Sequence, residues 1–103
     1  MFTPRYRNTQ TDRLVQALIA LQNEEDAYRF LEDVLTIQEL KSITQRLEVA
    51  AMLRQKETYQ EIVRKTGAST TTIGRVNRSL QYGADGYPIV LDQLDAMEES
   101  QQK

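Results

Sequence analysis

Hydroxyl and basic side chains gather in one short stretch of this 103-residue chain, between residues 58 and 80. Its second half opens with Ser69 and three consecutive threonines and continues with Arg75 and Arg78. Threonine is a middling helix former, so hydroxyl residues at the start of a helix add little stability. They can, however, hydrogen-bond phosphates and base edges, and their methyl groups can contact thymine. The pattern favours recognition of double-stranded DNA over catalysis.

The first half of this stretch predicts a short helix that ends in a tight turn. Thr58 and Glu61 have the spacing of a capping box, in which each side chain satisfies a backbone N–H of the first turn. Gly67 falls where the helix must end, and glycine adopts the left-handed conformation of such an end without steric cost. The expected apolar face of this helix comprises Ile62, Val63 and Thr66.

A second helix is expected directly after the turn, with Ser69 as its N-cap. Its inward stripe comprises Ile73, Val76 and Leu80, and its outward face comprises Thr70, Thr71, Gly74, Arg75 and Arg78. A short, polar and basic face of this kind suits a helix lying in the major groove. We therefore predict a helix-turn-helix over residues 58–80.

The expected DNA contacts fall into three groups. Ser69, Thr70 and Thr71 should meet base edges and nearby phosphates at the start of the second helix. Arg75 and Arg78 lie further along this helix and are expected to contact phosphate. On the preceding helix, the flanking DNA backbone should be anchored by Tyr59, Gln60 and Arg64.

The distribution of charge supports this prediction better than the net charge does. The chain carries a net charge of −2, but residues 54–78 hold six cations against two carboxylates. Residues 79–103 hold five carboxylates against one lysine. The local field at a docking face matters more than the total, since salt screens exposed charges within about 8–10 Å. The acidic C-terminal part leaves an alternative open, a helical protein–protein interaction module whose basic hairpin is merely solvated.

Several function classes are excluded or disfavoured by what the composition lacks. The chain has no cysteine and no histidine, so disulfides and His-based acid–base chemistry are excluded, and no metal site is expected. Carboxylates and lysines form no evident catalytic pair, so we expect no enzyme. The N-terminus lacks the apolar core of a signal peptide and no segment approaches a membrane span, so we expect a cytoplasmic protein without a membrane partner.

The rest of the chain also reads as helix, which predicts an all-α fold. We treat residues 1–103 as a single domain and expect a flexible arm over 1–10, N-terminal dimerisation helices over 11–35, a long central helix over 36–55 and a C-terminal helix over 88–99. The central helix should bury Leu40, Ile43, Leu47, Ala50, Ala51 and Leu53. Short helices need a partner surface. The N-terminal helices can fold back on the central helix or exchange with a second copy, and the spacing of recognition helices favours a homodimer.

The chain resembles the tryptophan repressor superfamily, and within it the TrpR-like branch of YerC/YecD type. The resemblance runs from about Leu35 to Leu94. Its strongest pieces are Leu35-Thr36 with Glu39, Ile43 and Arg46, the segment YQEIVRKTGAS and the segment TTTIGRVNRSLQYGADGY. It implies an intertwined homodimer of six-helix chains in which each subunit docks a helix-turn-helix on operator DNA. It also implies a transcriptional regulator, most simply a repressor.

The same resemblance implies an effector pocket between the central and recognition helices. The matching positions are Leu35, Thr36, Arg46, Arg75 and Ser79. Val76, however, stands where the repressor has a glycine against the indole ring, and a stiff valine would overpack that site. We therefore expect no cofactor and no tryptophan binding. An effector-gated repressor with another ligand stays open, as does a role for Arg46 and Arg75 in phosphate contacts or surface ion pairs.

Overall fold

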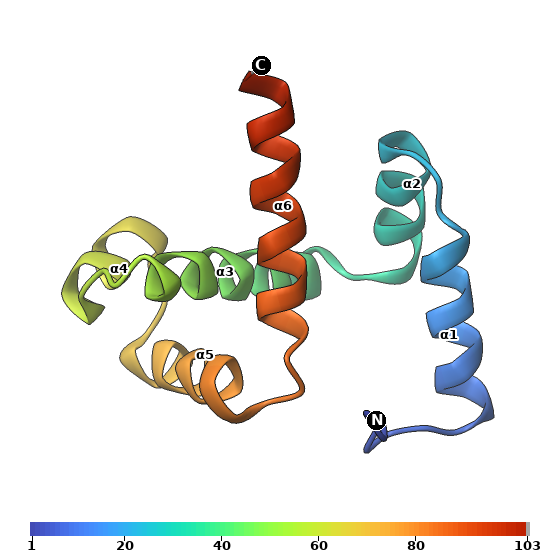
Figure 1. Ribbon diagram of the computed structural model, residues 1–103, viewed down its shortest axis with the longest axis horizontal. Coiled ribbons are helices and arrows are strands. Elements are labelled where there is room, and N and C mark those ends of the chain that lie inside the picture. Colours follow the sequence, from blue (N-terminus) through green and yellow to red (C-terminus); the bar gives the residue numbers. More distant parts are fainter. Residues whose placement is uncertain (103) are drawn as a thin grey trace. The chain divides into compact units, whose positions relative to one another are not determined.

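The computed structural model describes residues 1–102 and folds them into six helices, with no strand in that range (Figure 1). The helices are α1 (Thr9–Ala20), α2 (Glu24–Val34), α3 (Ile37–Arg54), α4 (Tyr59–Thr66), α5 (Thr70–Tyr82) and α6 (Gly86–Gln102). This confirms the all-α prediction. The contacts divide the chain into two compact units, residues 1–37 and the residues from 38 onward.

The first unit consists of α1 and α2 and buries none of the residues in either helix. Asn8 begins α1 with a reciprocal capping box to Thr11, so the N-terminal arm is shorter than the ten residues expected. Asn23 accepts the Asp26 N–H at 2.8 Å and so caps the start of α2. The large apolar side chains of α1 lie exposed; they are Leu14, Val15, Leu18 and Ile19. This helix therefore shows an unpartnered apolar face within one chain.

The second unit holds the core of the structure. Its buried side chains come from α3, α4, the turn after α4, α5 and α6, and they are Val49, Ala50, Ile62, Ala68, Ile73, Val76 and Leu91. The helix α5 packs against both α4 and α6 (Figure 1). The prediction for α3 was wrong at Ile43, which is 44% exposed, and it missed Val49, which is fully buried. Only the C-terminal half of α3 enters the core. An apolar stripe predicted along the whole helix therefore included residues that the structure leaves exposed.

Backbone features determine where α3 ends and where α6 begins. After α3, Lys56 adopts a left-handed conformation (φ 65°), and the N–H groups of Lys56 and Glu57 bond the carbonyls of Leu53 and Met52 at 3.0 and 3.1 Å. This is the Schellman arrangement that satisfies the last carbonyls of a helix. The helix α6 begins at Gly86 instead of residue 88, because the first turn tolerates Pro88.

An ion pair between Arg54 and Asp92 joins the end of α3 to α6, and the Arg54 guanidinium also donates to the Pro88 carbonyl at 3.2 Å. Hydrogen bonding to the Asp92 carboxylate raises the pKa of Arg54. Through residue 102, no helix is long and apolar enough to cross a membrane.

Candidate nucleic-acid interface

The corner between α4 and α5 is built from a glycine and a threonine. Gly67 has φ 74° and ψ 4°, the left-handed conformation predicted for it, and its N–H bonds the Val63 carbonyl at 2.9 Å. The Thr66 hydroxyl donates to the Ile62 carbonyl at 2.7 Å and accepts the Ala68 N–H at 3.1 Å. One hydroxyl thus bridges the last turn of α4 and the first residue beyond the corner.

These contacts correct the apolar face predicted for α4. Ile62 is fully buried, but Val63 lies exposed and Thr66 acts as a polar clip. The Thr66 carbonyl, left without a helical partner at the end of α4, accepts the Gln45 side-chain amide of α3 at 3.2 Å. The turn is therefore held from the central helix as well as from within.

Side-chain caps fix the starts of both helices. Thr58 accepts the Glu61 N–H at 3.2 Å, and Ser69 accepts the Thr72 N–H at 3.1 Å. The Glu61 carboxylate bonds Arg64 and so does not complete the capping box predicted with Thr58. The Ser69 hydroxyl donates to Thr72 Oγ1 at 3.1 Å, so its proton is used within the cap.

The outward face of the helix-turn-helix is open to solvent. All eight predicted DNA-contact residues are exposed, namely Tyr59, Gln60, Arg64, Ser69, Thr70, Thr71, Arg75 and Arg78. On the opposite side of α5, Ile73 and Val76 are buried and Leu80 is half-buried. The inward stripe of α5 is thus confirmed, and the helix presents a polar face above an apolar anchor.

Half of the basic charge in residues 54–78 is already paired. Besides the Arg54–Asp92 pair, Arg64 lies 2.7 Å from Glu61 and Lys65 lies 2.6 Å from Glu57. Within the part of the chain that the structure describes, the remaining cations form no ion pair; they are Lys56, Arg75 and Arg78. On the outward face of the helix-turn-helix, the unpaired positive charge therefore comes from Arg75 and Arg78 of α5.

A side-chain hydrogen-bond chain links α4 to α5. The Asn77 amide donates to the Tyr59 phenol oxygen at 3.4 Å, and the Gln81 amide donates to the Asn77 carbonyl oxygen at 3.2 Å. Neither Asn77 nor Gln81 was among the residues predicted from the sequence. Asn77 is the half-buried member of this chain of contacts.

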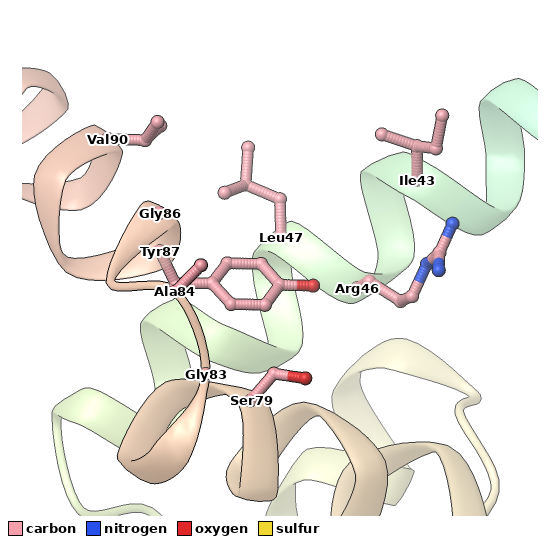
Figure 2. A pocket seen from close by; sticks show the side chains of 9 residues that line it. All are labelled: Ile43, Arg46, Leu47, Ser79, Gly83, Ala84, Gly86, Tyr87 and Val90. Carbon is pink, nitrogen blue, oxygen red and sulfur yellow. The ribbon is translucent and has the colours of Figure 1, made fainter. Parts of the chain in front are cut away.

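A hollow of about 510 Å³ lies between α3, α5 and the start of α6 (Figure 2). Its walls are mostly apolar and comprise Ile43, Arg46, Leu47, Ser79, Gly83, Ala84, Gly86, Tyr87 and Val90. Of the predicted effector residues, Arg46 and Ser79 are brought together here. Arg75 does not line the hollow, and Leu35 and Thr36 belong to the other unit. Val76, at 2% exposure, lies in the core and not in the wall.

The sequence of this chain matches one known protein family over most of its length. Residues 9–95, which include α1 to α5 and most of α6, match the family model of the Trp repressor protein. The chain belongs to the Trp repressor family. It is 46% identical over 94 residues to the uncharacterized protein YerC of Bacillus subtilis, covering 91% of this chain and 90% of YerC.

Solved structures of Trp repressor-like chains have the same fold. A TrpR-like protein from Eubacterium eligens is 52% identical with a TM-score of 0.83, covering 86% of this chain and 92% of that one. A Staphylococcus aureus structure is 45% identical with a TM-score of 0.82, covering 86% and 89%. The TrpR-like fold that the motifs predicted is therefore confirmed.

Proposed function

We propose that this member of the Trp repressor family is a sequence-specific DNA-binding regulator of transcription, a cytoplasmic homodimer that represses its target genes. Each subunit would lay α5 in the major groove of an operator. One observation carries the proposal. The face of α5 that holds Thr70, Thr71, Arg75 and Arg78 is exposed, while Ile73 and Val76 anchor the opposite face in the core.

The roles of the side chains follow from their chemistry and their partners. Thr70 and Thr71 would read base edges, since they are exposed at the start of α5. Arg75 and Arg78 would contact phosphates. Because no described carboxylate pairs with either guanidinium, a phosphate contact there replaces only water. Ser69 would contribute through its remaining lone pair and its backbone, because its hydroxyl proton serves the cap.

The homodimer is supported by the open apolar face of α1. Four large apolar side chains of this helix are exposed, and Ile19 reaches 70%. A second copy that covers this face would bury apolar area, which is favourable by about 25 cal/mol per Å². A dimer would also supply the second recognition helix, since two half-sites about 34 Å apart match successive major grooves.

Selection of purified protein on random DNA tests the proposal. We expect enrichment of one two-fold symmetric sequence. Arg75→Ala and Arg78→Ala should weaken binding to every duplex and lower the slope of log affinity against log salt by about one each per site. Arg13→Ala on α1 is the matched control and should leave the slope unchanged. No binding to any duplex would contradict the proposal and favour a protein–protein interaction module.

The hollow beside α5 favours a second candidate, an effector-gated regulator. A hollow of this size with mostly apolar walls suits the apolar body of a small ligand. The Arg46 Nε already donates to the Ser42 carbonyl at 3.3 Å, so an anionic group of the ligand would meet the remaining N–H groups of this guanidinium. Thermal-shift screening of amino acids, tryptophan included, tests it. A ligand at 100 times its Kd should add about 2.7 kcal/mol of stability. Uniform melting temperatures across the set would remove amino acids as effectors.

A further inference from the structure

The hydrogen-bond chain between α4 and α5 has a defined direction. The Asn77 carbonyl oxygen accepts from the Gln81 amide at 3.2 Å, so the Asn77 NH₂ group is the end that faces Tyr59. It donates to the phenol oxygen at 3.4 Å. A phenol has one proton to donate and can also accept. Because its oxygen accepts here, the Tyr59 O–H proton is directed away from Asn77.

The environment of Tyr59 shows where that proton can go. The side chain is 39% exposed, on the same helix as the exposed residues Gln60 and Arg64. Among the residues that the structure describes, the Tyr59 O–H donates to no protein acceptor. The phenol is thus held from the α5 side and is free to donate outward.

We infer that Asn77 is a positioning residue for DNA binding: it holds the Tyr59 phenol so that the O–H points to a DNA phosphate. This inference rests on the proposed function and adds a residue that does not itself touch DNA. An oriented donor loses less conformational freedom on binding than a free one, so the contact gains affinity through preorganisation. Its contribution is electrically neutral.

That neutrality separates Tyr59 from the arginines in a salt titration. The salt slope counts phosphates neutralised by cations, and a phenol neutralises none. Tyr59→Phe should therefore weaken binding about tenfold at every salt concentration without changing the slope, as expected for about 1.4 kcal/mol. Asn77→Leu keeps a side chain of similar size but removes the donor, and it should have a similar effect.

The test is a double-mutant cycle measured on the duplex recovered by selection. Wild type, Tyr59→Phe, Asn77→Leu and the double variant are titrated by fluorescence at several salt concentrations, and their thermal melts verify folding. If Asn77 acts through the phenol, the double variant binds as weakly as Tyr59→Phe and no weaker. Arg78→Ala is the charged control and should lower the slope.

Each outcome decides the matter. Tyr59→Phe with wild-type affinity overturns the inference, while loss of binding by Arg78→Ala in the same experiment leaves the proposed function standing. Additive effects in the double variant show that Asn77 acts independently of the phenol and also overturn it. If Asn77→Leu melts too early to titrate, Asn77→Ala, which also removes the amide donor and adds no bulk, takes its place in the cycle. No binding by the wild type ends both the inference and the proposed function.

Discussion

The Arg64 guanidinium lies 2.7 Å from the Glu61 carboxylate, one turn earlier on α4. Their hydrogen bond lowers the pKa of Glu61 and raises the pKa of Arg64. Both side chains are exposed enough for salt to screen the pair. A phosphate approaching Arg64 must therefore compete with Glu61, or share the guanidinium with it. If α4 contacts phosphate as proposed, we therefore expect it to bind more weakly than the sequence alone predicted, although Arg64 itself is exposed.

Removing the carboxylate should release the arginine. Glu61→Gln is expected to strengthen binding to all duplexes, because it deletes one negative charge near the phosphates and frees Arg64. Arg64→Ala should weaken binding to all sequences and lower the salt slope by about one. Salt titrations of the two variants check both expectations. An unchanged slope in Arg64→Ala would remove this residue from the phosphate contacts.

The same pair predicts a pH dependence of stability. Because the pKa of Glu61 is lowered in the folded protein, its contribution is complete above the ordinary pKa of a glutamate. It is lost as the pH falls through the lowered value. Wild type should therefore be more stable than Glu61→Gln at neutral pH, and the two should converge in acid. Urea unfolding across this pH range measures the difference. A gap that persists below the lowered pKa would contradict the assignment.

The helix-turn-helix could be predicted because its signals are local. Gly67 ends one helix and Ser69 begins the next within three residues, and both roles follow from backbone conformation and capping alone. The burial of Ile73 and Val76 followed from helical spacing. Once one face of α5 was predicted to be buried, the opposite face was predicted to be exposed.

The contacts that hold this interface could not be predicted, because they join residues far apart or compete with a simpler pattern. Gln45 reaches Thr66 across 21 positions, and Asn77 reaches Tyr59 across 18. The Glu61 carboxylate could accept either the backbone N–H of Thr58 or the guanidinium of Arg64, and in the structure it bonds Arg64. The sequence signal for Asn77 was its spacing, because a polar residue four positions after Ile73 and three before Leu80 lies beside the inward apolar stripe.

The left-handed turn gives a stability prediction with an internal control. A Cβ at Gly67 would meet nothing within 4 Å, so a substitution there acts through φ alone. Gly67→Val should lose about 2 kcal/mol or more, because β-branched residues are strained at positive φ, and DNA binding should disappear with the turn. Gly74→Ala, inside α5 with equal space around it, should gain about 0.5–1 kcal/mol. Urea unfolding measures the free energy of unfolding of both variants against that of the wild type. Wild-type stability and binding in Gly67→Val would refute the turn.

After α3, a non-glycine residue occupies a left-handed position, so the stabilising substitution there is to glycine. Lys56 occupies the left-handed position of the Schellman motif at φ 65°, where glycine carries no Cβ penalty. Lys56→Gly should stabilise the protein by about 1 kcal/mol. Lys56→Ala removes the same charge but keeps the strained φ, so it should show no such gain. Thermal melts of the two variants separate conformation from charge. Equal stabilisation of both would assign the effect to the lost charge.

The exposed face of α1 predicts the oligomeric state. Ile19→Asp places a charge on the face that a second copy would cover, at its most exposed apolar side chain, and burying an unpaired charge is costly. We expect the dimer dissociation constant to rise by at least about a hundredfold, equivalent to about 2.7 kcal/mol. Sedimentation equilibrium measures it, with circular dichroism to follow helix content. Tyr82→Asp is the matched control, because Tyr82 is 82% exposed at the end of α5, away from α1 in the sequence. A wild type that sediments as a monomer, or an Ile19→Asp variant as dimeric as the control, would contradict the homodimer.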